Sequence, residues 1–424
     1  MEGRSVPYHL PYYKRNLYVL SFTIFLAAVS WNQVVPFLPI FLRDLGVPDS
    51  DLAQWSGIIF AMQSVSGIVM QPLWGKLADR FGRKPMVVRA GICLVLIYMG
   101  MSICKTAWQL AIFRFLNGAL TGFIPGSIAL IATNTPELLS GRYVAIAQTA
   151  SATGGIIGPA IGGALAGLFG FRGAMQISGV VVLFSTLLVI WIVKEPNKAS
   201  INVETSLLED FRIAVRNPVL LVVMGTTMIA WIVSGAIQPI LTIYLEQLSS
   251  VEAHWLSGIV FSLPGLGFLL TAYRWSCLGE RISYYGALLR GLIGTGLSVF
   301  ALALVTNIWQ FAIFYFVSGV FMAAIAPCAA ALIATKVDES FRGRAYGIQQ
   351  AAGTMGGFVA PLAGGMIGGL LGLRYVFVFT AAVSLLGALM LRGKPGAQRV
   401  VAPTKMQARL WPHTAIPWKG RPHN

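Results

Sequence analysis

Apolar segments of about 20 residues recur along the whole chain, with short polar connections between them. Each segment is nearly free of charge and long enough to cross a bilayer core of roughly 30 Å as a helix. No soluble fold would bury so many of them. The pattern therefore predicts an all-α membrane protein with twelve transmembrane helices, at 17–41, 55–74, 86–104, 108–132, 143–169, 173–193, 219–244, 255–273, 286–306, 309–334, 345–371 and 374–391.

The second half of the chain repeats the first. Residues 141–172 align without gaps on 343–374, with 14 identities in 32 positions, and "PFLPIFLRDL" at 36–45 aligns on "PILTIYLEQL" at 239–248. An even number of spans gives both copies the same orientation, as in transporters built from parallel repeats. The prediction is two pseudo-symmetric six-helix bundles.

This repeat divides the chain into five parts. The bundles occupy 17–193 and 219–391, with a cytoplasmic tail at 1–16 and a basic, disordered tail at 392–424. The linker at 194–218 contains an amphipathic pattern, with Leu207, Leu208, Phe211 and Val215 near one helical face. The first apolar run is too long for a cleaved signal peptide, so it is expected to remain as a span.

The net charge of +16 follows membrane topology. Successive loops alternate between the two sides of the membrane. Of the 31 Lys and Arg residues, only Arg43, Lys105, Arg172 and Arg374 lie in the loops on one side, and only Arg114 lies deep inside a span. Basic residues concentrate on the cytoplasmic side, so both termini are predicted to be cytoplasmic and nucleic acid is not an expected partner.

No pattern in the chain indicates an enzyme. The four cysteines have no paired spacing, and the four histidines lie outside the spans, so neither a disulfide framework nor a metal site is expected. No phosphate-binding loop for ATP and no cluster of catalytic side chains is visible. No cofactor is expected.

The stretch "GKLADRFGRKP" at 75–85 joins the second and third spans. A topology signal requires its bases but neither its glycines nor Asp79. The counterpart at 276–286, "SCLGERISYYG", has lost three of the bases. The stretch is therefore predicted to form a cytoplasmic gate, from Gly75, Asp79, Arg80, Gly82, Arg83 and Lys84.

Two spans carry backbone features. The fifth contains Gly154, Gly158, Pro159, Gly162 and Gly163, whose small-residue spacing lets another helix approach closely. The first contains Pro36 and Pro39, which predict a bend.

Arg114, in the fourth span, is the only charge deep in any predicted span. A charge at that depth costs at least ~2.5–3.5 kcal/mol, so Arg114 requires a cavity or a polar partner. Both a structural pair and a functional role are open. The second half has Tyr315 at the equivalent position, and all fifteen acids lie in tails, loops or span ends. A lone buried arginine fits a neutral or anionic substrate better than a cation.

A wide, adaptable cavity is expected between the halves, because aromatic, methionine and amide side chains recur on spans near the centre. For any one of these residues, core packing is an equally good interpretation. The candidates are Asn32, Gln33, Gln63, Phe123, Trp231, Gln238, Tyr315, Met322 and Gln349.

Three of these motifs resemble those of one family. The 75–85 stretch is similar to the cytoplasmic loop signature of the major facilitator superfamily, and "GGIIGPAIGG" to the antiporter signature of its drug-efflux branch, with Ala145 in place of an early glycine. The segment around Arg114 resembles the family's fourth-span motif, with Asn117 replacing a glutamine. Over residues 16–392 the chain resembles the twelve-span drug/proton antiporters, and among them multidrug efflux transporters.

The resemblance implies proton-coupled efflux of amphiphilic small molecules by alternating access, in a monomer of the cytoplasmic membrane. The proton gradient would drive transport; substrate, protons and lipids would be the partners. The alternative on the same fold is an uptake symporter, or an exporter of one metabolite or lipid-linked sugar. The resemblance ties Arg114 to proton coupling. It also implies that the loop latches the outward-facing state, with Asp79 near Gly343 and Arg344; we further expect Arg83 to pair with Glu137.

Overall fold

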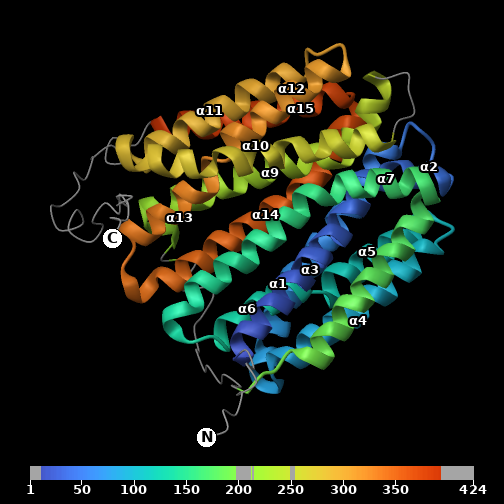
Figure 1. Cartoon of the computed structure of the whole chain (residues 1–424). Helices are drawn as coiled ribbons and strands as arrows, with labels where there is room; N and C mark the ends of the chain where they lie inside the picture. Colours follow the sequence, from blue (N-terminus) through green and yellow to red (C-terminus); the bar gives the residue numbers. More distant parts are fainter. Residues whose placement is uncertain (1–10, 197–211, 213, 249–253, 393–424) are drawn as a thin grey trace, which may run out of the picture.

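The computed structural model describes residues 11–196, 212, 214–248 and 254–392 (Figure 1). Apart from short turns, these residues form helices. They are α1 (Tyr12–Val34), η1 (Val35–Phe37), α2 (Leu38–Asp44), α3 (Leu52–Phe81), α4 (Arg83–Ser102), α5 (Ala107–Leu120), α6 (Phe123–Thr133), α7 (Glu137–Ile192), α9 (Pro218–Leu248), α10 (His254–Ile282), α11 (Tyr284–Leu302), α12 (Ile308–Met322), α13 (Ile325–Lys336), α14 (Glu339–Leu370) and α15 (Leu373–Arg392).

The described part of the chain contains eleven segments long and apolar enough to cross a membrane. One of them, within α7, makes two crossings, because the chain reverses at Gly170 (φ 69°, ψ 173°). Arg172, just after this turn, donates to the carbonyls of Ser102 and Cys104, where α4 ends. Glu195, which follows the second crossing, accepts from a backbone N–H group at the start of α4. The two contacts lie at opposite ends of α4, so the second crossing spans the same length as α4. The predicted twelve-span architecture is confirmed.

Several predicted spans end within a few residues of the observed helices, whereas α3 continues to Phe81 and α10 to Ile282, beyond the predicted ends at 74 and 273. Helix α1 begins at Tyr12, ahead of the apolar run, so part of the predicted N-terminal tail is helical. The first crossing changes to a 3-10 turn at Val35–Phe37, which confirms the expected bend near Pro36. The C-terminal tail and most of the predicted amphipathic linker helix lie outside the described residues.

The two predicted bundles are α1–α7 and α9–α15, and Figure 1 shows them as separate groups of helices. Turns and hydrogen bonds recur at equivalent positions of the two bundles. Gly372 (φ 111°) turns the chain between α14 and α15 as Gly170 does within α7. The Trp74 indole donates to the Ala119 carbonyl at 2.6 Å, and its counterpart Trp275 donates to Val320 at 2.7 Å. The sequence repeat is therefore a structural repeat.

Glycines bring α7 against α1. A Cβ added at Gly154 would lie 2.6 Å from the Phe25 carbonyl oxygen, and one at Gly158 would lie 2.9 Å from that of Val29. At Gly162 it would overlap the Gln33 carbonyl outright. In the second bundle, Gly356 and Gly364 of α14 face α9 in the same way. The small-residue spacing of the fifth span is confirmed as a helix-packing surface.

The two bundles meet along α3 and α14, and along α7 and α10. We define the seam as Ala53, Gly57 and Ser64 of α3 with Gly357, Pro361 and Gly365 of α14. A Cβ at Gly57 would overlap the Pro361 carbonyl, one at Gly365 would lie 2.6 Å from the Ala53 carbonyl, and Ser64 donates to the Gly357 carbonyl at 3.1 Å.

Beyond the seam, several glycines border open space. Added Cβ atoms at Gly75, Gly141, Gly343 and Gly347 would meet no atom within 4 Å. These glycines lie on α3, α7 and α14 toward the end of the molecule that carries Gly82, whereas the seam lies toward the end that carries Gly46. The contacts described between the bundles thus lie toward the Gly46 end, and the four glycines toward the Gly82 end meet no atom of the opposite bundle.

Replacing Gly162 with Ala should destabilise the protein, because the new methyl group overlaps the Gln33 carbonyl. Overpacking of this kind costs about 1–3 kcal/mol. Thermal unfolding in detergent micelles should show a lower Tm for this variant. The control is Gly167→Ala on the same helix, where the methyl group meets no atom within 4 Å and Tm should not fall. Equal Tm values for the two variants would contradict the packing role.

Candidate functional site

Arg114 lies on α5, inside the first bundle. Only 4% of it is exposed, and its guanidinium carbon lies 5.3 Å from the centre of the Phe60 ring on α3. It forms no ion pair with any acid whose side chain is described. Its Nε atom has no hydrogen-bond partner among the described residues. The carboxylate partner that would make Arg114 purely structural is therefore absent from the described part of the chain.

Other buried polar groups line α3 and α5 near Arg114. The Asn117 Nδ2 and Gln63 Oε1 atoms are buried without a hydrogen-bond partner among the described residues. The two helices come close because Gly118 packs directly on the Gln63 backbone. Buried polar atoms without partners are costly and rare, so their concentration beside a lone cation marks this part of the bundle as a functional candidate.

Three of the candidate cavity residues lie in packed interiors instead. Gln33 is 3% exposed and donates to the Ala174 carbonyl at 3.1 Å and to the Ser178 hydroxyl. Phe123 is 2% exposed in the core of the first bundle. Tyr315 is 8% exposed, with its ring 5.4 Å from that of Phe311. These side chains hold the bundles together and do not line a cavity.

The remaining candidates are more accessible. Trp231 is 48% exposed and lies against Gly353 and Gly356 of α14. The other four are partly buried. They are Asn32, which donates to the Ala28 carbonyl of its own helix, Gln349, which donates to the Thr227 hydroxyl, Met322, whose sulfur accepts from the Ser234 hydroxyl, and Gln238.

The charges of the 75–85 stretch contact their own bundle. Arg83 donates to the Asp79 carboxylate at 3.0 Å, Lys84 donates to the Ile190 carbonyl, and the Arg80 guanidinium lies over the Phe81 ring. The expected position of Asp79 near Gly343 and Arg344 stays a prediction; a Cβ at Gly343 would meet no atom within 4 Å. Asp79 is the partner observed for the Arg83 guanidinium, while the side chain of Glu137 lies outside the described structure.

Glu195 contacts the predicted gate stretch, and the sequence prediction missed it. Its carboxylate accepts hydrogen bonds from the backbone N–H groups of Arg83 (2.7 Å) and Lys84 (2.9 Å), and so caps α4. Gly82, between α3 and α4, has φ 101°, and a Cβ there would lie 3.0 Å from a Glu195 oxygen. The signal in the sequence was an acid immediately after the sixth span, where the chain returns to the same end.

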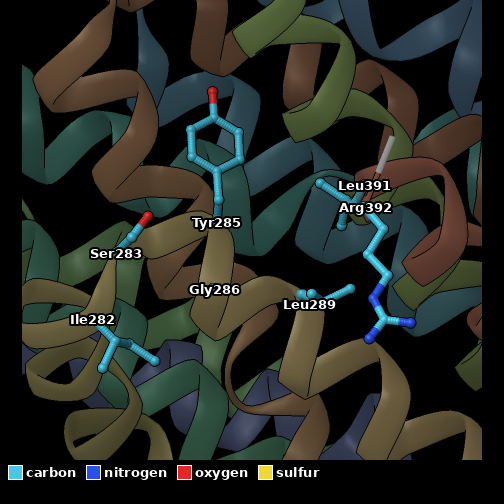
Figure 2. Close-up of a pocket in the computed structure, with 7 residues that line it drawn as sticks. All are labelled: Ile282, Ser283, Tyr285, Gly286, Leu289, Leu391 and Arg392. Carbon is cyan, nitrogen blue, oxygen red and sulfur yellow. The ribbon is translucent and has the colours of Figure 1, made fainter. Parts of the chain in front are cut away.

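The second bundle differs at the position equivalent to Gly82. The counterpart of Gly82 is Ser283, with φ 112°, and it borders a pocket of about 280 Å³ at the start of α11 (Figure 2). The pocket lies within one bundle, so it is not part of the space between the two. Its lining residues are Ile282, Ser283, Tyr285, Gly286, Leu289, Leu391 and Arg392.

A sequence profile of the Major Facilitator Superfamily matches residues 20–266 and again 223–420. The chain belongs to this superfamily of transporters. The two overlapping matches follow the repeat of the two bundles. The match also establishes the fold and multi-pass membrane class that the sequence predicted.

Similar proteins of known name narrow the position of this chain within the superfamily. It is 34% identical to the multidrug resistance protein MdtG of Proteus mirabilis, over 88% of this chain and 93% of that protein. It is 33% identical to MdtG of Salmonella paratyphi C, over 92% of this chain and 96% of that protein. The resemblance to multidrug efflux transporters inferred from the motifs is confirmed at this level.

Solved transporters share the fold at low sequence identity. A bacterial homologue of the human lysosomal transporter Spinster, in an inward-facing and unoccupied conformation, has a TM-score of 0.75 and 16% identity, and the match covers 93% of this chain and all of that one. The nucleoside transporter NupG, in a D323A mutant, has a TM-score of 0.74 and 14% identity, with 90% and 99% covered.

Replacing Glu195 with Ala should lower Tm, because two backbone N–H groups at the start of α4 lose their acceptor. Loss of a helix cap costs about 0.5–2 kcal/mol. Glu195→Gln should fall between Ala and wild type, since an amide oxygen still accepts but carries no charge. The control is Glu280→Ala, which removes an exposed carboxylate in the second bundle. If Glu280→Ala lowers Tm as much as Glu195→Ala, the loss of charge rather than of the cap is responsible.

Proposed function

We propose that this transporter is a proton-coupled exporter of amphiphilic small molecules, acting as a monomer in the cytoplasmic membrane. The observation that carries the proposal is the one-sided distribution of the described contacts between the bundles, which lie along the seam toward the Gly46 end. Two similar bundles around a central site can rock so that the site opens to one side at a time. Export is supported by the MdtG relatives, whose names describe multidrug resistance.

The orientation follows from the distribution of basic residues. Most of the Lys and Arg residues lie in the two chain ends and in the alternate loops that begin with 75–85, or in the span ends beside them, so the positive-inside rule supports a cytoplasmic Gly82 end. In this orientation the conformation is proposed to be inward-facing, with the cytoplasmic end accessible. The pairing of Asp79 with Arg83 of its own bundle supports this state, because the loop is proposed to latch the outward-facing one.

Arg114 is proposed to link protons to substrate. It is a lone cation in a region without described mid-span carboxylates, so the site favours neutral or anionic amphiphiles over cations. A carboxylate at a span end would carry the coupled proton, and Asp44, Asp79 and Glu246 are the candidates. Trp231, Met322 and Gln349 are proposed to contribute to the substrate site, since aromatic, thioether and amide groups accommodate varied ligands.

Transport in inside-out vesicles tests the proposal. Vesicles that contain the protein and are energised by respiration should accumulate a neutral amphiphilic dye, and an uncoupler should abolish the accumulation. Vesicles without the protein are the control. Accumulation that resists the uncoupler would exclude proton coupling, while protein-dependent dye loss from preloaded energised vesicles would support the uptake alternative. A resistance profile in a pump-deficient host then identifies substrates.

Arg114→Gln should abolish proton-driven accumulation while leaving the protein folded, because the substitution removes the buried charge. Arg114→Lys should retain part of the activity. The matched control is Tyr315→Phe at the equivalent position of the second bundle, which should transport like wild type. Unchanged accumulation in Arg114→Gln would remove Arg114 from the mechanism.

A further inference from the structure

A cross-bundle ion pair closes the Gly46 end. Two guanidinium nitrogens of Arg43, at the end of α2, lie 3.2 Å from a carboxylate oxygen of Glu246, near the end of α9. Of the ion pairs formed by described residues, this one joins the two bundles, whereas Arg43–Asp49 and Arg83–Asp79 each lie within the first bundle. Its position puts the two charges where the bundles must part for that end to open.

The repeat explains why these two residues meet. In the alignment of 36–45 on 239–248, Arg43 and Glu246 occupy equivalent positions. Residues close to a two-fold axis contact their own equivalents across it. Two identical charges at this position would repel each other. The repeats have instead diverged to opposite charges, which turns the unavoidable contact into an attractive one.

A second polar contact beside the pair also joins the bundles. The Thr242 hydroxyl donates to the Pro36 carbonyl, and Thr242 is fully buried. The equivalent of Thr242 in the first bundle is Pro39, which has no hydroxyl to donate, so the hydrogen bond is made in one direction only. The broken first crossing therefore supplies both a free carbonyl and a cation to the opposite bundle.

We infer that Arg43 and Glu246 are gating residues whose ion pair latches the transporter closed at the Gly46 end. The inference rests on the proposed transport function. Arg43 is 42% exposed and Glu246 31% exposed, so the pair is partly screened by water. An exposed pair shifts a two-state equilibrium by up to about fivefold, which suits a latch that must open in every cycle.

Distance measurements between spin labels test the latch directly. A variant with the four native cysteines replaced by serine would carry labels at Lys105→Cys and Thr306→Cys, two exposed positions just before α5 and α12, at the same end as the pair. Arg43→Glu should increase the population with a long distance by roughly fivefold or more, because attraction becomes repulsion. Glu246→Arg should have the same effect.

The exchange of both charges is the decisive variant. Arg43→Glu combined with Glu246→Arg restores an attractive pair, so the distance distribution should return to that of the labelled parent protein. Asp49→Asn is the matched control, since Asp49 contacts Arg43 within one bundle, and it should leave the distribution unchanged. A double exchange that behaves like either single reversal, or single reversals without any shift, would overturn the inference.

Neutral variants keep the latch testable if a charge reversal prevents folding. If a charge reversal fails to fold, Arg43→Gln and Glu246→Gln should still raise the long-distance population by a smaller factor, and their failure to do so would refute the latch. The measurement uses no substrate and no proton gradient. A latch would therefore be detected even if the chain proved not to export drugs, and the two proposals fail separately.

Discussion

The contact between a row of glycines and the backbone of the facing helix holds each bundle of this transporter together. Within a bilayer the hydrophobic effect does not drive helices together, so close packing has to supply the attraction. Helix α7 meets α1 through Gly154, Gly158 and Gly162, and α14 meets α9 through Gly356 and Gly364. These two pairs place the first and fifth spans of each bundle, and with them the residues of α7 and α14 that face the other bundle.

The two bundles share this framework and differ in their chemistry. Arg114 is buried in the first bundle, while the second has a tyrosine packed into an aromatic core at the same position. Glu195 caps the start of α4, while the equivalent start of α11 borders a pocket beside Arg392. The repeat thus supplies a symmetric mechanical frame, and substitutions at equivalent positions assign different tasks to its two halves.

The sequence predicted the frame better than the side-chain environments. Hydrophobic length and the repeat defined twelve spans, and the glycine spacing located the α7–α1 contact. The cavity was harder, because a span that is apolar on all sides gives no indication of which face packs inward. Gln33 and Phe123 were therefore placed in the cavity although both are buried within a bundle.

Two further differences between the sequence prediction and the structure have other causes. Glu195 was missed because its backbone partners are 111 and 112 positions away in the chain, and nothing in the local sequence specifies that pairing. The observed partner of Asp79 is Arg83 of its own bundle, whereas the contact expected with α14 is proposed for the outward-facing conformation. A motif indicates which residues meet at some point in the cycle, and only a structure shows in which state they do.

The seam between α3 and α14 is made largely of backbone. Gly57, Gly365 and Ala53 approach so closely that no side chain fits between them, which makes this region impermeable to solutes. The same small residues have few side-chain atoms, and the dispersion attraction of a contact grows with the number of atoms it brings together. A barrier built this way is tight in geometry and weak in energy. It can exclude a drug molecule when closed and still separate and re-form without a large energetic penalty.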